Sequence, residues 1–125
     1  MPDLSSNRAV TLAFDEFARA SLEEQAGSDG LRTDDLVRMA VTYYLGDLSA
    51  GRFVRRVPRF AAHAAPVRRL EVRVELPAGD WKALDGEAIR QAVPVARLIE
   101  HAVIYYLADL ESGRVAARIV ENSTG

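Results

Sequence analysis

Large apolar residues occupy every second position along two short stretches, one from Val10 to Phe14 and one from Leu70 to Leu76. Successive side chains of a β-strand point to opposite faces, so this period of two predicts half-buried strands at residues 8–14 and 70–76. Residues 1–7 are polar and are expected to be frayed. The faces directed at solvent would carry Ala9, Thr11 and Ala13 in the first strand and Glu71, Arg73 and Glu75 in the second.

Each strand is followed by two stretches in which apolar residues recur at helical spacing. In the first half these cover residues 16–26 and 33–51. In the second half one helix begins near Asp80 and the other has Pro94 in its first turn, where the missing amide hydrogen costs nothing. Side-chain oxygens at helix starts accept hydrogen bonds from first-turn amides. The expected N-caps are Asp15, Thr33 and Asp80.

A stretch of the first half recurs in the second half. Residues 40–52 align with residues 102–114 at an offset of 62 positions without a gap, and nine of the thirteen pairs are identical. The same offset aligns apolar positions from about residue 9 to about residue 120, whereas the polar positions differ. We interpret the chain as two copies of one strand-helix-helix unit, because self-similarity at a fixed period indicates a repeated structural unit.

The two copies are expected to share one core within a single intertwined domain, residues 1–125. Repeat one covers about 8–52, a basic connector covers 53–69, and repeat two covers about 70–120. Half of the chain alone is marginal for burying a core, and a lone strand would leave its main-chain groups unpaired. The expected fold is mostly α, with the strands paired as a two-stranded antiparallel β-ribbon about a pseudo-twofold axis over four helices.

Charge is unevenly distributed. Residues 52–69 contain six arginines and no acid, so the remainder holds 10 basic and 18 acidic residues, or −8, within a total of −2. Lys82 is the single lysine. The arginine bias fits bidentate phosphate contacts, although a GC-rich genome explains it more simply. This uneven distribution, an acidic body with a basic connector, says more about possible partners than the net charge of the whole chain does.

Several function classes find no support in the sequence. The absence of cysteine excludes disulfides and thiolate chemistry. There is no Ser-His-Asp arrangement, no phosphate-binding glycine loop and no metal-ligand spacing. No apolar run approaches the roughly 20 residues that span a bilayer, and no signal peptide is visible. We therefore expect a cytoplasmic protein that is not an enzyme, without cofactor, metal or membrane partner.

Residues 30–40 (GLRTDDLVRMA), together with the element order and the repeat, resemble the ribbon-helix-helix family of the Arc and methionine-repressor type. Most members of that family are homodimers, whereas here one chain would carry both halves as a pseudo-dimer. The resemblance implies a bacterial transcription regulator, such as a repressor, that places its ribbon in the major groove of double-stranded DNA. It also implies that two such chains assemble on adjacent half-sites.

The resemblance assigns DNA contacts to the outward ribbon residues and phosphate contacts to two helix starts. The connector arginines would neutralise flanking phosphates. The implied residues are Ala9, Thr11, Ala13, Glu71, Arg73 and Glu75 on the ribbon, Arg32 and Thr33 at one phosphate clamp, residues 93–95 at a second, and Arg55, Arg56, Arg59, Arg68 and Arg69 in the connector.

Alternatives remain open at this point. The alternating charges of the second strand also fit a solvated strand face, and the connector also fits a solvated linker. Asp34 and Asp35 set negative charge beside the first clamp, and the acidic body suits DNA poorly. The same fold could therefore serve as a protein-interaction module, such as an antitoxin or accessory subunit, or as a structural homo-oligomer.

Other conspicuous residues have structural interpretations. One tyrosine of each Tyr-Tyr pair is expected to pack inward while the other stands at the surface, and His101 is expected in the core or at its rim. Phe53 and Phe60 are expected to be core anchors. Asp47 and Asp109 are expected to be solvated or to pair locally with the arginine five positions later. The Tyr-Tyr pairs are Tyr43-Tyr44 and Tyr105-Tyr106.

Overall fold

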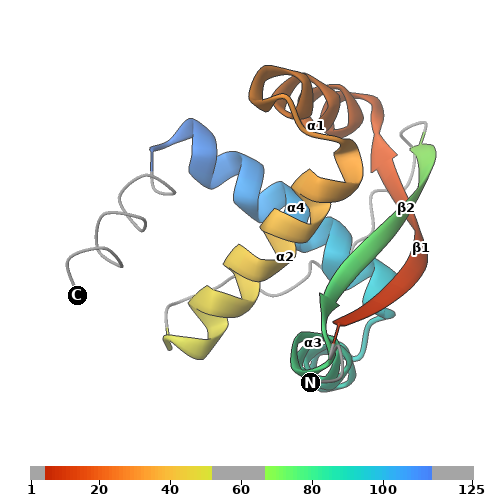
Figure 1. Ribbon diagram of the computed structural model, residues 1–125, viewed down its shortest axis with the longest axis vertical. Helices are drawn as coiled ribbons and strands as arrows, with labels where there is room; N and C mark the ends of the chain where they lie inside the picture. The colour runs from red at the N-terminus through yellow and green to blue at the C-terminus, as the bar shows by residue number, and fades with distance from the viewer. Residues whose placement is uncertain (1–4, 52–66, 114–125) are drawn as a thin grey trace.

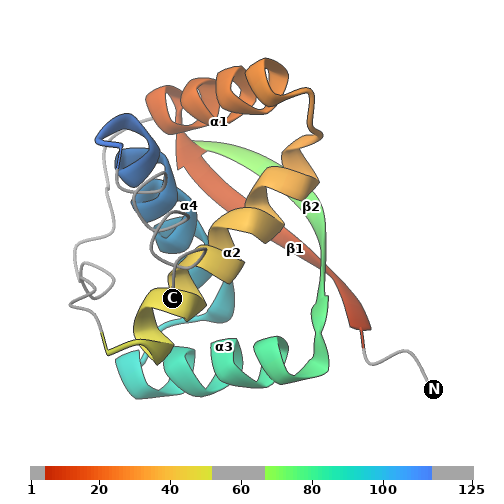
Figure 2. The ribbon, with the colours of Figure 1, turned by 60° about the vertical axis from the view of Figure 1, so that its left-hand side comes forward.

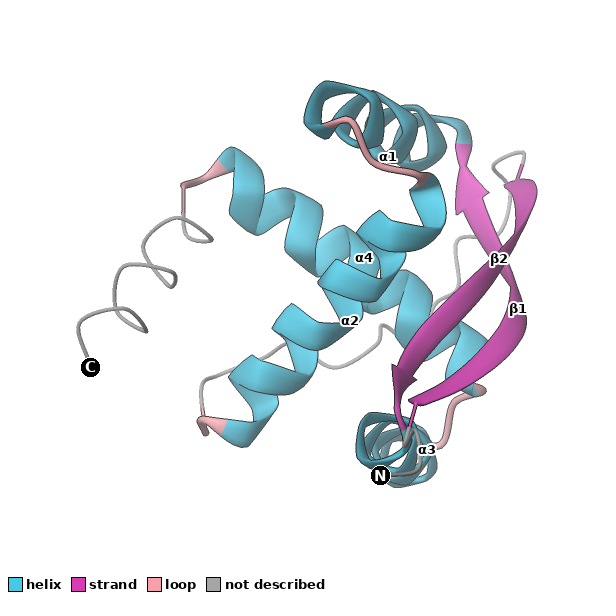
Figure 3. Ribbon diagram, viewed as in Figure 1, coloured by secondary structure: helices cyan, strands magenta, loops and turns pink. Residues whose placement is uncertain are grey.

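The chain forms two strands and four helices in the computed structural model, which describes residues 5–51 and 67–113. The elements are β1 (Ser5–Asp15), α1 (Glu16–Asp29), α2 (Thr33–Ser49), β2 (Val67–Pro77), α3 (Ala78–Gln91) and α4 (Val95–Glu111). Figures 1 and 3 show the two strands as one ribbon beside the helices. The expectation of a mostly helical protein with a two-stranded antiparallel ribbon is confirmed.

β1 and β2 pair antiparallel along their whole length, from Ser5 opposite Pro77 to Asp15 opposite Val67. Both predicted strands are confirmed, and both extend beyond their predicted ends because the pairing continues there. The prediction that residues 1–7 are frayed is therefore wrong for residues 5–7. The predicted connector is also too long at its C-terminal end, since residues 67–69 belong to β2; its residues 53–66 lie outside the described part, as do Phe53 and Phe60.

The inner face of the ribbon packs against all four helices. In Figures 1 and 2, α2 and α4 cross beside the ribbon, while α1 and α3 lie near its opposite ends. Burial of one aliphatic side chain contributes about 1.5–3 kcal/mol to the free energy of unfolding. Because both halves supply side chains to the same core, that burial stabilises both halves together. The buried members of this core include Leu12, Phe14, Val72, Val74 and Leu76 from the ribbon and Leu22, Leu36, Val41, Leu84, Leu98 and Val103 from the helices.

The boundaries of α1 follow from two short-range interactions. Asp15 caps the helix as predicted, because its Oδ1 accepts a 2.7 Å hydrogen bond from the Ala18 amide. The helix continues to Asp29, three residues beyond the prediction, and ends at Gly30. Gly30 has a φ of 68°, a left-handed conformation that glycine adopts without steric cost.

The predicted starts of the other helices are shifted. Arg32, not Thr33, is the N-cap of α2, and Thr33 is the first helical residue. Asp80 lies within the first turn of α3, because that helix begins directly after Pro77. Pro94 is the N-cap of α4, one position before the first turn. Within residues 5–51 and 67–113, no helix is both long enough and apolar enough to cross a bilayer.

Candidate nucleic-acid interface

The outer face of the ribbon is open to solvent, since the helices pack on the inner face (Figures 1 and 2). Its side chains are exposed, apart from the half-buried Ala13. Between Asn7 and Ala13, the cross-strand pairs on this face are Asn7–Glu75, Ala9–Arg73, Thr11–Glu71 and Ala13–Arg69. The six ribbon residues singled out from the sequence therefore share one surface. Asn7 and Arg69 belong to the same surface but were not singled out from the sequence. The period of two that joins Thr11 to Ala9 leads on to Asn7, and the period that joins Arg73 to Glu71 leads on to Arg69, so the sequence pattern could have identified both.

The two strands contribute differently to the charge of this face. Between Asn7 and Ala13, β1 supplies no charged side chain, whereas β2 supplies two arginines and two glutamates, Arg69, Glu71, Arg73 and Glu75, in alternation. The charges of these four cross-strand pairs therefore sum to zero, and the exposed Asp15 adds one negative charge where β1 ends. Within the described part of the chain, no ion pair engages either arginine. Both guanidinium groups consequently retain their donors for a ligand.

Carboxylates of the two crossing helices reach the edges of the ribbon. Glu100 Oε2 on α4 accepts a 2.7 Å hydrogen bond from the Ala13 amide of β1. Asp34 Oδ2 on α2 accepts a longer bond, 3.4 Å, from the Arg73 amide of β2. Burial raises the pKa of Glu100, while the Ala13 amide and the charge of Arg97 oppose that shift. Unpaired amides at a strand edge invite pairing with other chains, so these contacts also protect the ribbon.

One end of the ribbon is anchored to α3 by Arg8. Its guanidinium carbon lies 4.2 Å from the centre of the Trp81 ring, a cation–π geometry. The same group donates to both carboxylate oxygens of Asp85, with Nη2 at 3.0 Å from Oδ2 and Nη1 at 3.2 Å from Oδ1. This anchor holds the strand while leaving its outward neighbours, Asn7 and Ala9, at the surface.

The two predicted phosphate clamps differ in charge. At the start of α2, Asp35 Oδ2 accepts the Arg32 amide at 3.4 Å, and Asp34 Oδ2 lies 3.8 Å from Arg32 Nη2. The acids therefore already engage the groups that a phosphate would contact. At the start of α4, residues 93–95 are followed by a first turn without acids. The exposed Arg97 adds a positive charge there.

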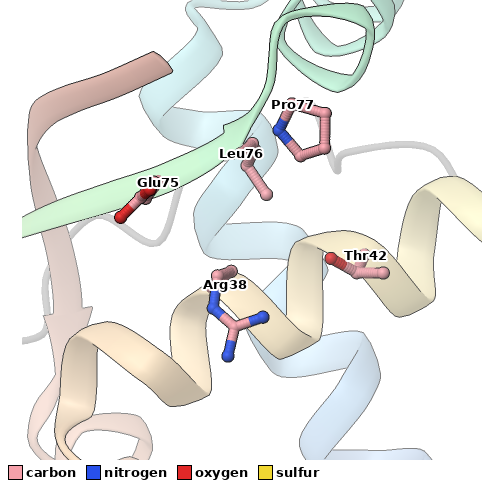
Figure 4. Close-up of a pocket in the computed structure, with 5 residues that line it drawn as sticks. All are labelled: Arg38, Thr42, Glu75, Leu76 and Pro77. Atoms are coloured by element: carbon pink, nitrogen blue, oxygen red, sulfur yellow. The ribbon is translucent and has the colours of Figure 1, made fainter. Parts of the chain in front are cut away.

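A shallow pocket lies between α2 and the end of β2. Figure 4 shows that Arg38 and Thr42 come from α2, and that Glu75, Leu76 and Pro77 come from the strand. A neighbouring depression continues along the ribbon edge and is lined by charged groups of both signs, Arg32, Asp34, Asp35, Arg38, Arg73 and Glu75, together with Asn7. The pockets therefore extend the mixed-charge character of the ribbon face toward α2.

Some predicted site residues are not placed. Arg55, Arg56 and Arg59 lie outside the described residues. Arg68 belongs to β2, opposite Phe14, but its side chain is also outside the described part. Arg69 moves from the predicted connector to the ribbon face, where it stands opposite Ala13. Of the five connector arginines that were predicted to contact DNA, Arg69 is therefore the one that the structure places on the candidate interface.

The tyrosines and aspartates that recur in the two halves lie where α2 and α4 cross. Tyr44 and Tyr106 are buried, as expected for one member of each pair. The other members are half-buried, and their hydroxyls donate hydrogen bonds to aspartates. Tyr43 donates to Asp109 and Tyr105 donates to Asp47, and each bond is 2.6 Å long. The expectation that these aspartates are solvated is wrong, because each is only 4 % exposed. Their predicted arginine partners lie outside the described residues.

His101 lies at the rim of this cluster, as expected, with its ring edge-on to Tyr44 at 5.8 Å between centroids. In the portion of the chain that the structure describes, no three histidine, aspartate or glutamate side chains gather as metal ligands would. Comparisons with protein-family models, with curated proteins and with solved structures found no match to this chain.

Proposed function

We propose that this chain is a sequence-specific DNA-binding regulator of ribbon-helix-helix type that inserts its ribbon into the major groove. The observation that carries the proposal is the uncovered outer face of the paired strands, with hydrogen-bonding side chains at alternate positions. The major groove admits a two-stranded β-ribbon and presents a distinct pattern of donors and acceptors for each base pair. A rigid helical core beneath the ribbon keeps those side chains in place for such readout.

We further infer that the chain is a tandem pseudo-dimer, in which two strand-helix-helix repeats form what a homodimer forms in the resembled family. Each element of the second half begins and ends 62 positions after its counterpart in the first half, for example Ser5 and Val67 or Thr33 and Val95. The antiparallel register pairs Val10 with Val72, which are also 62 positions apart. A pseudo-twofold axis through that pair accounts for both facts.

The reciprocal tyrosine–aspartate bonds support the same axis. Tyr43 and Tyr105 are 62 positions apart, as are their acceptors Asp109 and Asp47, and the two bonds have equal length. Exchange of the halves therefore converts one bond into the other. Two chains of this kind are expected to associate on adjacent DNA sites as a dimer of pseudo-dimers. The molar mass of the DNA complex, measured by light scattering, tests this expectation.

The outward residues have chemical roles that follow from their side chains. Arg69 and Arg73 suit bidentate donation to guanine, and Asn7 suits adenine. Thr11 forms one hydrogen bond to a base edge, while Ala9 and Ala13 suit the methyl group of thymine. Glu71 and Glu75 accept from the amino group of cytosine, and the connector arginines contact phosphates. Arg32 contacts a phosphate only where its guanidinium leaves Asp34.

Selection from a randomised duplex library at low salt, followed by titration of an enriched duplex, tests the proposal. Arg73→Ala is expected to weaken binding by about 1–3 kcal/mol, roughly 5- to 150-fold. Lys82→Ala removes an exposed positive charge on α3 and serves as the matched control. Failure of the wild-type protein to enrich any duplex, or equal losses for both variants, would reject specific readout by the ribbon.

A second candidate is a protein-interaction module that retains the fold without strong DNA binding. The balanced charges of the ribbon face and the acids at the start of α2 favour it, because DNA affinity comes largely from neutralised phosphates. A protein partner with alternating charges would complement this face. Partner capture that is lost in Glu71→Arg, in a protein that enriches no duplex, would support this candidate over the first.

A further inference from the structure

The two strands of the ribbon present different chemistry at equivalent positions. On the outer face, the offset of 62 matches Asn7 with Arg69, Ala9 with Glu71, Thr11 with Arg73 and Ala13 with Glu75. None of these pairs is conserved in residue type. On the inner face, by contrast, Val10 and Val72 are identical. The next two pairs at the same offset, Leu12 with Val74 and Phe14 with Leu76, are both large and apolar. The repeats have therefore kept a common core while their exposed faces diverged.

This divergence acts differently on the two sides of the Val10–Val72 midpoint. On one side, the pair nearest the midpoint is Ala9–Arg73; on the other side, it is Thr11–Glu71. The innermost charged group is thus a guanidinium on one side and a carboxylate on the other. Arg69, the second arginine, lies on the carboxylate side but farther from the midpoint, opposite Ala13. A homodimeric ribbon would place the same residue at both of these positions.

The surroundings of the ribbon carry the same asymmetry. On the Arg73 side, Asp34 contacts the ribbon edge and, with Asp35, sets negative charge beside the DNA backbone that the proposed function requires. On the other side, the edge contact is also made by a carboxylate, Glu100 of α4, but the first turn of that helix has no acid. Base contacts and phosphate contacts therefore both differ between the two sides.

We propose that one chain reads a non-palindromic DNA site in a fixed orientation set by the charged strand β2. This inference rests on the proposed function. Guanine is expected beside the midpoint on the Arg73 side, and cytosine beside it on the Glu71 side, with a second guanine farther out under Arg69. Arg69 and Arg73 are four residues apart, about 13 Å along an extended strand, which corresponds to roughly four base-pair steps.

The test uses duplexes short enough to hold one ribbon. Selection from a randomised segment flanked by constant ends is expected to enrich sites without twofold symmetry. The chain contains no cysteine, so Ser28→Cys in the exposed last turn of α1 provides a unique attachment point for an iron chelate that cleaves DNA locally. Cleavage is expected toward one end of the selected site only.

The exchange variant Thr11→Arg/Arg73→Thr moves the innermost arginine across the midpoint. It is expected to prefer a site in which the guanine beside the midpoint has moved to the other side, by at least about fivefold over the original site. Unchanged circular dichroism and melting would establish that it folds. The fuller exchange of all four outward pairs is expected to reverse the end at which the chelate cleaves the enriched site.

The outcomes separate the two levels of the proposal. Enriched sites with twofold symmetry, or cleavage of equal intensity at both ends, would overturn oriented readout while leaving DNA binding intact. A preference of the exchange variant for the original site would do the same. No enrichment of any duplex would reject the proposed function itself, and oriented readout with it.

Discussion

The hydroxyl of Tyr43 on α2 donates a 2.6 Å hydrogen bond to Asp109 Oδ2 on α4. The acceptor is almost completely buried, although it is a carboxylate near the end of its helix. Tyr105 makes the same bond in the opposite direction, to Asp47. Charged groups are rarely buried without strong hydrogen bonds, so this reciprocal pair specifies how the two helices cross. The crossing in turn supports the ribbon on which the proposed DNA contacts lie.

Tyr43→Phe is expected to lower the free energy of unfolding by about 1.5–3 kcal/mol, since a bond to a buried charged acceptor is lost. Tyr44→Phe is the matched control. The Tyr44 hydroxyl accepts a 3.3 Å bond from the neutral Gln91 side chain, so its removal is expected to cost only about 0.5–1.5 kcal/mol. Urea denaturation measures both values. Equal decreases in the free energy of unfolding for the two variants would show that the bond to Asp109 stabilises the protein no more than the bond between Gln91 and Tyr44.

Glu100→Gln is expected to stabilise the protein increasingly as pH rises above about 4, the ordinary pKa of a glutamate. Burial raises the pKa of Glu100 in the folded state, so the stability linked to its neutral form is complete below the unfolded pKa. That stability is lost as pH rises through the folded pKa. Glutamine cannot ionise, and its Oε1 can still accept the Ala13 amide.

The measurement is the difference in melting temperature between the Glu100→Gln variant and wild type at a series of pH values from below the ordinary glutamate pKa upward. Glu71→Gln, which removes an exposed carboxylate from the ribbon, controls for the loss of one surface charge. A Glu100→Gln difference that stays constant with pH would contradict the assignment of a half-buried, ionisable contact between Glu100 and the ribbon edge.

Arg8→Lys is expected to destabilise the protein by about 0.5–1 kcal/mol, because lysine loses both the paired bonds to Asp85 and the guanidinium plane over Trp81. The value is small because both charged side chains are more than one third exposed to solvent. A double-mutant cycle of Arg8→Ala and Asp85→Ala is expected to give a coupling of about 0.2–1 kcal/mol. Zero coupling would indicate that the anchor acts through the aromatic ring alone.

Replacement of Arg55, Arg56 and Arg59 by alanine is expected to weaken binding to all duplexes alike. Each phosphate contact that is lost reduces the slope of log affinity against log salt by about 0.9. Binding measured at three salt concentrations, with specific and scrambled duplexes in parallel, separates this effect from base readout. A selective loss on the specific duplex would assign these arginines to sequence recognition instead.

Much of the fold was predictable from the sequence, because the repeat and the periodicities report backbone and core. Antiparallel pairing of the two strands was predicted, and Val10 and Val72, which are identical and 62 positions apart, lie opposite each other in the ribbon. The helix starts were less predictable. Asp80 resembles an N-cap, yet Pro77 already supplies the extended residue before α3, so the helix begins earlier.

The interactions that connect the two halves were not predictable from local patterns. Asp47 and Asp109 recur at equivalent positions, but only the helix crossing reveals that each accepts a tyrosine hydroxyl from the other half. Glu100 likewise looks like a surface residue of an amphipathic helix until the ribbon edge is placed beside it. Long-range partners of polar groups depend on tertiary packing, which periodicity does not encode.

The central claim is that the outer face of the ribbon binds DNA. Nuclear magnetic resonance of ¹⁵N-labelled protein, titrated with a duplex from the selection and with a scrambled duplex of equal length, tests this most directly. We expect the specific duplex to shift the amides of β1 and β2 around Thr11 and Arg73 in a saturable manner, and the scrambled duplex to shift them far less. Shifts confined to residues outside the ribbon, or identical shifts with both duplexes, would contradict the claim.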